Sequence, residues 1–74
     1  ESSNLSQLPD SFGHLRNLTD LSLANNAFSE FPEVILRLKS LKVLNLQGNK
    51  FDEQTKVRIR TAVEKELPNT RLFL

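Results

Sequence analysis

The chain has 74 residues, with ten Lys and Arg against nine Asp and Glu and a formal net charge of +1. That length allows one small domain, in which only about 60% of the unfolded surface can be buried, and the near-zero charge gives no general attraction to nucleic acid or to a membrane. The lack of cysteine excludes a disulfide framework and thiolate metal sites, no apolar run reaches the roughly 18 residues of a membrane helix, and the start ESSN does not resemble a signal peptide.

The N-terminal stretch reads as the second half of a unit that recurs 23 residues later. The residues Leu5, Leu8, Pro9, Phe12 and Leu15 correspond to Phe28, Phe31, Pro32, Ile35 and Leu38. Residues 1–3 fall where a strand would end, so we expect a C-terminal fragment of a longer array. An uncapped end exposes its apolar side. We expect upstream repeats of the same chain to pack there, or self-association through this N-terminal edge.

Two copies of one pattern follow at the same period. LTDLSLANNAF occupies residues 18–28 and LKVLNLQGNKF occupies residues 41–51. Within each copy two leucines are spaced two residues apart, as on one face of a β-strand: Leu21 and Leu23, and Leu44 and Leu46. We expect this face of each short strand to point toward the core. The Asn after each strand, Asn26 or Asn49, lies where the chain turns. A buried amide there can bond the free backbone groups of its own turn and its neighbour's, which predicts a structural ladder of asparagines.

Over roughly residues 5–51 this pattern resembles the consensus of the leucine-rich repeat, one of the fixed-period arrays. The resemblance implies an α/β solenoid, with parallel strands on a concave face and short 3-10 or α returns on a convex face. The return segments, residues 8–15 and 31–38, begin with Leu-Pro and Phe-Pro, which suits a tight helical turn. Apolar residues three apart should point inward from these turns: Phe12, Leu15, Ile35 and Leu38.

After Phe51 the pattern changes to an amphipathic helix of about 14 residues. Ile59, Val63 and Leu67 form its apolar stripe, Asp52 is the expected N-cap, and Pro68 should stop it. Residues 70–74 restore the L-x-L alternation and predict a last parallel strand. The order of helix and strand resembles the C-terminal closing unit of small bacterial leucine-rich-repeat proteins and of the ribonuclease-inhibitor-like class.

Residues between the core leucines should face outward from the sheet. Leucine-rich-repeat proteins typically bind partners on the concave sheet, so the resemblance implies a protein-binding face there. Its candidate residues are Asp20, Ser22, Ala24, Val43, Asn45, Gln47, Arg71 and Phe73. Strands about 4.8 Å apart would place them in rows: Asp20 with Val43 and Arg71, and Ser22 with Asn45 and Phe73. Any one of these residues on its own is better explained as a solvated position, whereas the face as a whole favours binding.

Other chemistries have little support in the residues. The one histidine, His14, is expected on the surface of a return segment, and the carboxylates scatter over different faces, so no catalytic set converges. No metal or other cofactor is expected, because the chain lacks a suitable set of ligands. Cations on the C-terminal helix raise the question of nucleic acid, but the glutamates beside them indicate a solvated face of a cap. We expect neither nucleic-acid nor membrane binding.

We interpret the chain as one domain: a partial repeat at 1–17, a repeat at 18–40, the strand and turn of the last repeat at 41–51, and a cap at 52–74. The favoured function is a non-enzymatic protein-interaction module. The alternative is the C-terminal substrate-recognition or capping part of a larger enzyme or effector whose catalytic domain lies upstream. A third interpretation is a closing unit with no partner beyond its neighbouring repeats. Fold alone does not identify the molecule that is recognised.

Overall fold

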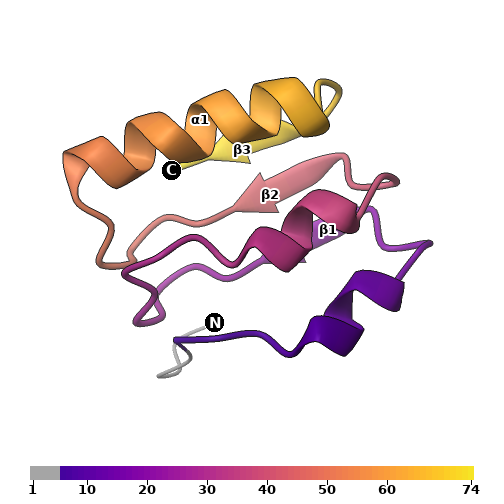
Figure 1. The fold of residues 1–74 in the computed structure, drawn as a ribbon, viewed down its shortest axis with the longest axis horizontal. Helices are drawn as coiled ribbons and strands as arrows, with labels where there is room; N and C mark the ends of the chain where they lie inside the picture. The colour runs from indigo at the N-terminus through magenta and orange to yellow at the C-terminus, as the bar shows by residue number, and fades with distance from the viewer. Residues whose placement is uncertain (1–5) are drawn as a thin grey trace.

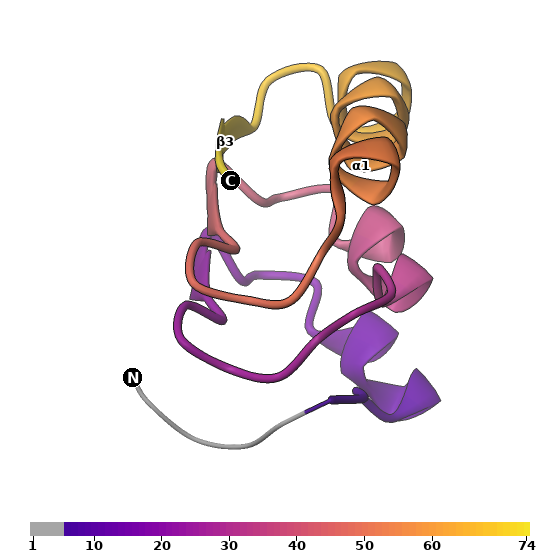
Figure 2. The same ribbon diagram turned by 90° about the vertical axis from the view of Figure 1, so that its left-hand side faces the viewer.

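Short elements alternate between two layers of the molecule (Figure 1). In the computed structural model, which describes residues 6–74, they are η1 (Asp10–His14), β1 (Asp20–Ser22), η2 (Glu33–Arg37), β2 (Val43–Asn45), α1 (Glu53–Glu66) and β3 (Arg71–Phe73), where η marks a 3-10 helix. The expectations for residues 1–3 and for Leu5 lie outside the described residues. Viewed from the side, the strands form one layer and the helices form the other (Figure 2). The predicted α/β solenoid is confirmed.

The strands form one parallel sheet in the order β1-β2-β3. Its register aligns Leu21 with Leu44 and Leu44 with Leu72. Backbone hydrogen bonds between neighbouring chain segments continue past the ends of the short strands. Just after β1, for example, Leu23 N–H donates to the Asn45 carbonyl at 2.8 Å. The central residue of each strand is therefore a leucine aligned with the leucine of its neighbour.

The core lies between the two layers. Every buried residue in the described part of the chain is apolar; they are Leu23, Phe28, Ile35, Leu38, Leu41, Leu44, Leu46, Phe51, Ile59, Val63 and Leu67. Leu44 is fully buried, but its counterpart Leu21 is only half-buried because β1 is an edge strand. Burial therefore increases from the β1 end of the stack toward its centre.

The two 3-10 helices, η1 and η2, begin directly after Pro9 and Pro32, as the position of the prolines predicts. Phe12 N–H donates to the Pro9 carbonyl and Ile35 N–H to the Pro32 carbonyl, both at 3.0 Å. The burial of the two returns differs, however. Leu15 is 44% exposed, whereas its counterpart Leu38 is fully buried. The physical reason is position in the stack: η2 packs against both η1 and α1, whereas among the elements of residues 6–74 η1 packs mainly against η2.

The C-terminal helix α1 closes the other end of the stack. Its N-cap is Asp52, whose carboxylate accepts a hydrogen bond from Thr55 N–H at 2.8 Å. The predicted apolar stripe packs into the core, and the helix ends before Pro68. Lys39 Nζ donates to the carbonyl of Glu66 at 3.2 Å, which places a cation at the negative end of the helix dipole. No helix within residues 6–74 has the length and hydropathy needed to cross a membrane.

Asn49 ties the last repeat to the one before it. Its Nδ2 donates to the carbonyls of Leu46 and Leu23, each at 2.9 Å, and its Oδ1 accepts from Phe28 N–H at 3.0 Å. Asn26 Nδ2 donates to the Leu23 carbonyl at 3.0 Å. The prediction that both amides are buried is wrong in degree, since each side chain lies at the turn and is half-buried. The Asn49 amide nonetheless joins backbone groups of two repeats.

Candidate protein-binding surface

The outward side of the sheet carries the residues that alternate with the core leucines. The register places Asp20 beside Val43 and Val43 beside Arg71, and it aligns Ser22, Asn45 and Phe73 in the next row. Gln47 and Ala24 follow just beyond the strands, where Asn25 N–H donates to the Gln47 carbonyl at 2.8 Å. We call these eight residues the sheet face: Asp20, Ser22, Ala24, Val43, Asn45, Gln47, Arg71 and Phe73.

The sheet face carries a shallow hollow of about 510 Å³. Its lining is formed by Asp20, Leu21, Ser22, Val43, Asn45, Gln47 and Phe73. Leu21 was not among the predicted site residues, because its spacing marks it as a core leucine. Its partial exposure comes from the edge position of β1, which the repeat pattern does not reveal. Ala24 and Arg71 lie outside this lining.

Phe73 is the largest apolar side chain on the sheet face, and it is 40% exposed. The guanidinium carbon of Arg71 lies 5.9 Å from the centre of its ring. A cation at this distance over an aromatic ring is attracted by the ring quadrupole. The contact holds a charged and an aromatic side chain together on the outside of β3. Both types are enriched among residues that dominate protein interfaces.

The polar side chains of the sheet face are held by local hydrogen bonds. Asn45 Oδ1 accepts from Gln47 N–H at 3.0 Å, and Ser22 Oγ accepts from Ala24 N–H at 3.5 Å. These contacts orient the side chains at the ends of β1 and β2. The Asn45 amide nitrogen and the Gln47 side chain remain on the surface with donor and acceptor groups. The face therefore combines a partly apolar floor with adaptable polar groups at its rim.

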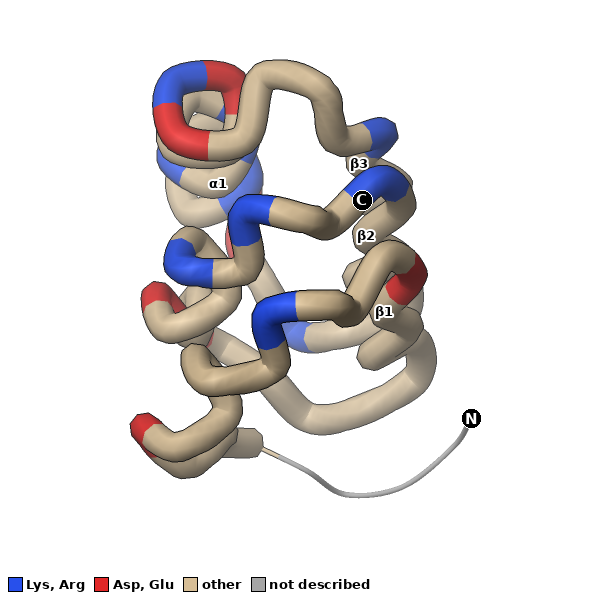
Figure 3. The backbone as a smooth tube through the Cα atoms, turned by 90° about the vertical axis from the view of Figure 1, so that its right-hand side faces the viewer, with Lys and Arg blue, Asp and Glu red and all other residues tan. Residues whose placement is uncertain are grey.

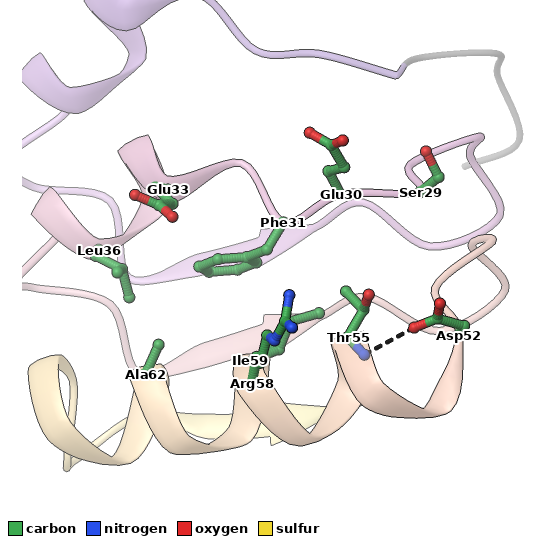
Figure 4. A pocket seen from close by; sticks show the side chains of 10 residues that line it. All are labelled: Ser29, Glu30, Phe31, Glu33, Leu36, Asp52, Thr55, Arg58, Ile59 and Ala62. Carbon is green, nitrogen blue, oxygen red and sulfur yellow. Dashed lines mark hydrogen bonds between the residues drawn. The ribbon is translucent and has the colours of Figure 1, made fainter.

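A second hollow of about 540 Å³ lies between η2 and α1 (Figure 4). Apolar side chains line its floor, including Phe31, Leu36 and Ile59, and Arg58 extends into it from α1. Asp52 lies at one end, where the hydrogen bond from Thr55 N–H and then the positive charge of Arg58 hold the pKa of its carboxyl below the ordinary value of 3.8. This carboxylate is an N-cap, so its role is explained by the helix.

No group of three or more His, Asp or Glu within residues 6–74 could hold a metal ion. His14 is exposed on η1, and its counterpart in the next return is Arg37. The sheet face is consequently the surface whose composition points to a function.

A family model described as leucine rich repeat matches residues 1–51. The chain belongs to the leucine-rich-repeat family. Its fold is similar to that of a leucine-rich-repeat protein of Leptospira interrogans, with a TM-score of 0.79 and 34% sequence identity. That match covers 96% of this chain but 17% of the Leptospira protein. No curated protein matches the chain. Leucine-rich-repeat domains generally serve as interaction scaffolds for protein partners, and this leucine-rich-repeat domain is a module of that kind.

Proposed function

We propose that the domain binds a protein partner through its sheet face, without catalysing a reaction. The observation that carries the proposal is the outward side of β3, where Arg71 lies over a Phe73 ring that is 40% exposed. A large apolar side chain on an exposed sheet costs solubility, whereas at the centre of an interface it supplies contact area. Phe73 is thus the proposed anchor, and Val43 beside it extends the apolar floor.

The rest of the sheet face fits the same role. Asn45 and Gln47 supply amide groups that can bond a partner's backbone, and Ser22 and Asp20 add acceptors on the next strand. The hydrogen bonds within the face limit the side-chain entropy that binding would have to remove. Arg71 can pair with a carboxylate of the partner while it remains stacked on Phe73.

The division of the chain belongs to the proposal as well. Residues 1–17 are a partial repeat, 18–40 a repeat, 41–51 the strand and turn of the last repeat, and 52–74 the cap. Because the chain spans only 17% of the Leptospira protein's length, the natural protein can contain further repeats or other domains. In the alternative function these repeats select the substrate of an upstream catalytic domain. Both functions use the same sheet face.

Site-specific photo-crosslinking tests the proposal. A photoreactive amino acid at Gln47 on the sheet face should give a saturable crosslink to a protein from an extract of the source organism. The same amino acid at Glu64, which is exposed on α1, is the matched control and should not give that product. Phe73→Ala should abolish the Gln47 product, because it removes the anchor.

The expected outcome includes an intact fold in the Phe73→Ala variant, checked by circular dichroism, because Phe73 lies outside the core. Equal crosslinking from Gln47 and Glu64, or a Gln47 product that persists in Phe73→Ala, would refute binding through the sheet face.

A further inference from the structure

Charged side chains are segregated between the two kinds of turn in this molecule. The segments that lead from a helix to the first residue of the next strand, residues 14–20, 37–43 and 67–71, contain five cations and one carboxylate, that of Asp20. We call these cations the basic side: Arg16, Arg37, Lys39, Lys42 and Arg71. The segments that lead from a strand into a helix, residues 23–32 and 46–52, contain the carboxylates of Glu30 and Asp52 and one cation, Lys50. Cations are therefore concentrated in the helix-to-strand turns, although the net charge of the chain is small.

The basic side is continuous across the repeats. Ser40 Oγ donates to the Arg16 carbonyl at 2.5 Å, so the first two helix-to-strand turns lie side by side. Arg71 N–H donates to the Lys42 carbonyl at 2.8 Å, which joins the second turn to the third. Lysines and arginines from successive turns lie on the side of the molecule that Figure 3 turns to the viewer. The solenoid therefore stacks single cations into a row.

Most of these cations have no acidic partner. Within residues 6–74, ion pairs join Lys39 to Glu66 and Lys56 to Glu53, and neither includes Arg16, Arg37, Lys42 or Arg71. Arg37 is held in place, since a Cβ at Gly13 would lie 2.9 Å from Arg37 Cδ. The stem of Arg37 thus packs against the preceding return, where a glycine leaves room for it. A row of exposed and unpaired cations attracts an anion that can contact several of them at once.

We propose that the basic side binds an acidic, extended segment of the protein partner, rich in Asp and Glu. The choice of a protein segment rests on the proposed function. The basic side borders the sheet face directly, because Lys42 precedes Val43 in the chain and Arg71 belongs to both surfaces. A partner seated on Phe73 can therefore lay an acidic segment along Lys42 and Arg16. The acidic turns on the other side of the molecule disfavour a nucleic acid that would wrap around it.

A short fluorescent peptide of Glu, Asp and Ser is the probe, and its anisotropy is measured with the whole chain. Binding should be detectable at low salt and should weaken steeply toward physiological salt, because exposed charges are screened. Arg16→Glu combined with Lys42→Glu should weaken binding about tenfold or more, since it replaces attraction with repulsion. Neither residue belongs to the sheet face. Lys50→Glu combined with Arg60→Glu changes the net charge equally and should leave binding unchanged.

A peptide of Lys, Arg and Ser, a single-stranded oligonucleotide of matched charge and vesicles containing phosphatidylserine are the comparison ligands. No binding of the acidic peptide, or equal losses in the two double variants, would overturn the inference. Tighter binding of the oligonucleotide or of the vesicles would overturn it in favour of that anion. Light scattering at low salt tests whether a second copy of the chain occupies the basic side. Self-association of the wild type that is lost in the Arg16→Glu, Lys42→Glu variant would assign the basic side to that second copy.

This result is separable from the test of the sheet face. Loss of peptide binding with an unchanged Gln47 crosslink would leave the proposed function in place and remove only the acidic segment. An acidic peptide that binds, with no specific Gln47 crosslink, would support the basic side and refute the sheet face.

Discussion

Gly48 packs against Asn25, the residue at the same place one repeat earlier, and both have a left-handed backbone, with φ of 76° and 61°. A Cβ at residue 48 would lie 3.1 Å from the backbone nitrogen of Asn25 and would overlap the side-chain Oδ1 of the same residue. The stacked turns therefore need a glycine in the second of them, both for its conformation and for the space.

Gly48→Ala should lower the free energy of unfolding by about 1 to 3 kcal/mol, because the left-handed conformation is strained for alanine and the neighbouring backbone is close. Urea denaturation followed by circular dichroism measures the change. Gly13→Ala is the control. Its Cβ would meet Arg37 Cδ at 2.9 Å and Val34 Cγ2 at 3.2 Å, but side chains can move, so its cost should be smaller. Equal costs would mean that the turn does not need glycine.

The Asn49 amide makes a second prediction. Asn49→Ala removes the bonds to the Leu23 and Leu46 carbonyls and the acceptor for Phe28 N–H, and it should cost about 1 to 3 kcal/mol. Asn45→Ala, on the sheet face, should cost about 0.5 kcal/mol or less. Small and equal shifts in urea midpoints would show that water replaces the Asn49 bonds without loss.

Truncating the apolar stripe of α1 tests its role as the closing element. Leu67 is buried, so Leu67→Ala should destabilise the fold by about 2 to 5 kcal/mol through lost burial and a residual cavity. Val57 lies on the same helix but is 60% exposed, and Val57→Ala should be close to neutral. Thermal melts of the two variants decide the matter. A larger loss from Val57→Ala would mean that α1 does not close the core.

Acid should weaken the N-cap of α1. The pKa of Asp52 is lowered in the folded chain, chiefly by the hydrogen bond from Thr55 N–H, so the unfolded chain takes up the proton first as the pH falls. The contribution of this carboxylate to stability is fully present above its ordinary pKa of 3.8 and is lost as the pH falls through the lower folded value. Asp52→Asn keeps an acceptor but does not titrate.

Urea melts of wild type and Asp52→Asn from neutral to acidic pH provide the measurement. The advantage of the wild type should shrink below the ordinary pKa of Asp52. Two stability curves that stay parallel throughout the acid range would show that Asp52 does not contribute through its charge.

The β1 end of the stack is expected to limit stability. β1 is an edge of the sheet, and Leu15 is 44% exposed where Leu38 is fully buried. A designed extension that places a copy of residues 18–40 before this end should raise the melting temperature and suppress any dimer, because it covers the edge and the apolar returns. An extension that leaves the melting temperature and the light-scattering mass unchanged would show that residues 1–17 already cap the stack.

Much of the fold could be predicted because the repeat specifies it more than once. Leu21 and Leu44 have the same spacing to their neighbours, so parallel stacking in register was the natural arrangement, and the rows of the sheet face follow from that register. An exposed apolar side at the N-terminal end of the stack was also expected from the partial first repeat, but the degree of burial of each residue there was not. Leu15 and Leu21 match Leu38 and Leu44 in type but lie at the end of the stack, where there are fewer neighbours.

The details of the sheet face were harder to predict where the period breaks. Leu72 follows its partner Leu44 by 28 residues, against 23 between Leu21 and Leu44. The L-x-L spacing of residues 70–74 still predicted the alignment of β3 across this longer return. The contact between Arg71 and Phe73, by contrast, depends on side-chain conformations that spacing does not specify. The charge segregation is visible in the sequence only after each residue has been assigned to one of the two kinds of turn.

Hydroxyl groups at the start of the strands join each turn to the one before it: Ser40 Oγ bonds the Arg16 carbonyl, and Thr70 Oγ1 bonds the Leu41 carbonyl at 2.7 Å. Each of these two hydrogen bonds joins one unit to the next, and neither reaches a more distant unit. Gene duplication of a whole 23-residue unit would therefore repeat the link that this unit carries. Insertion of a single residue within a strand would turn its leucines to water. Evolution of this array should proceed by whole units, with the closing helix and strand inherited unchanged.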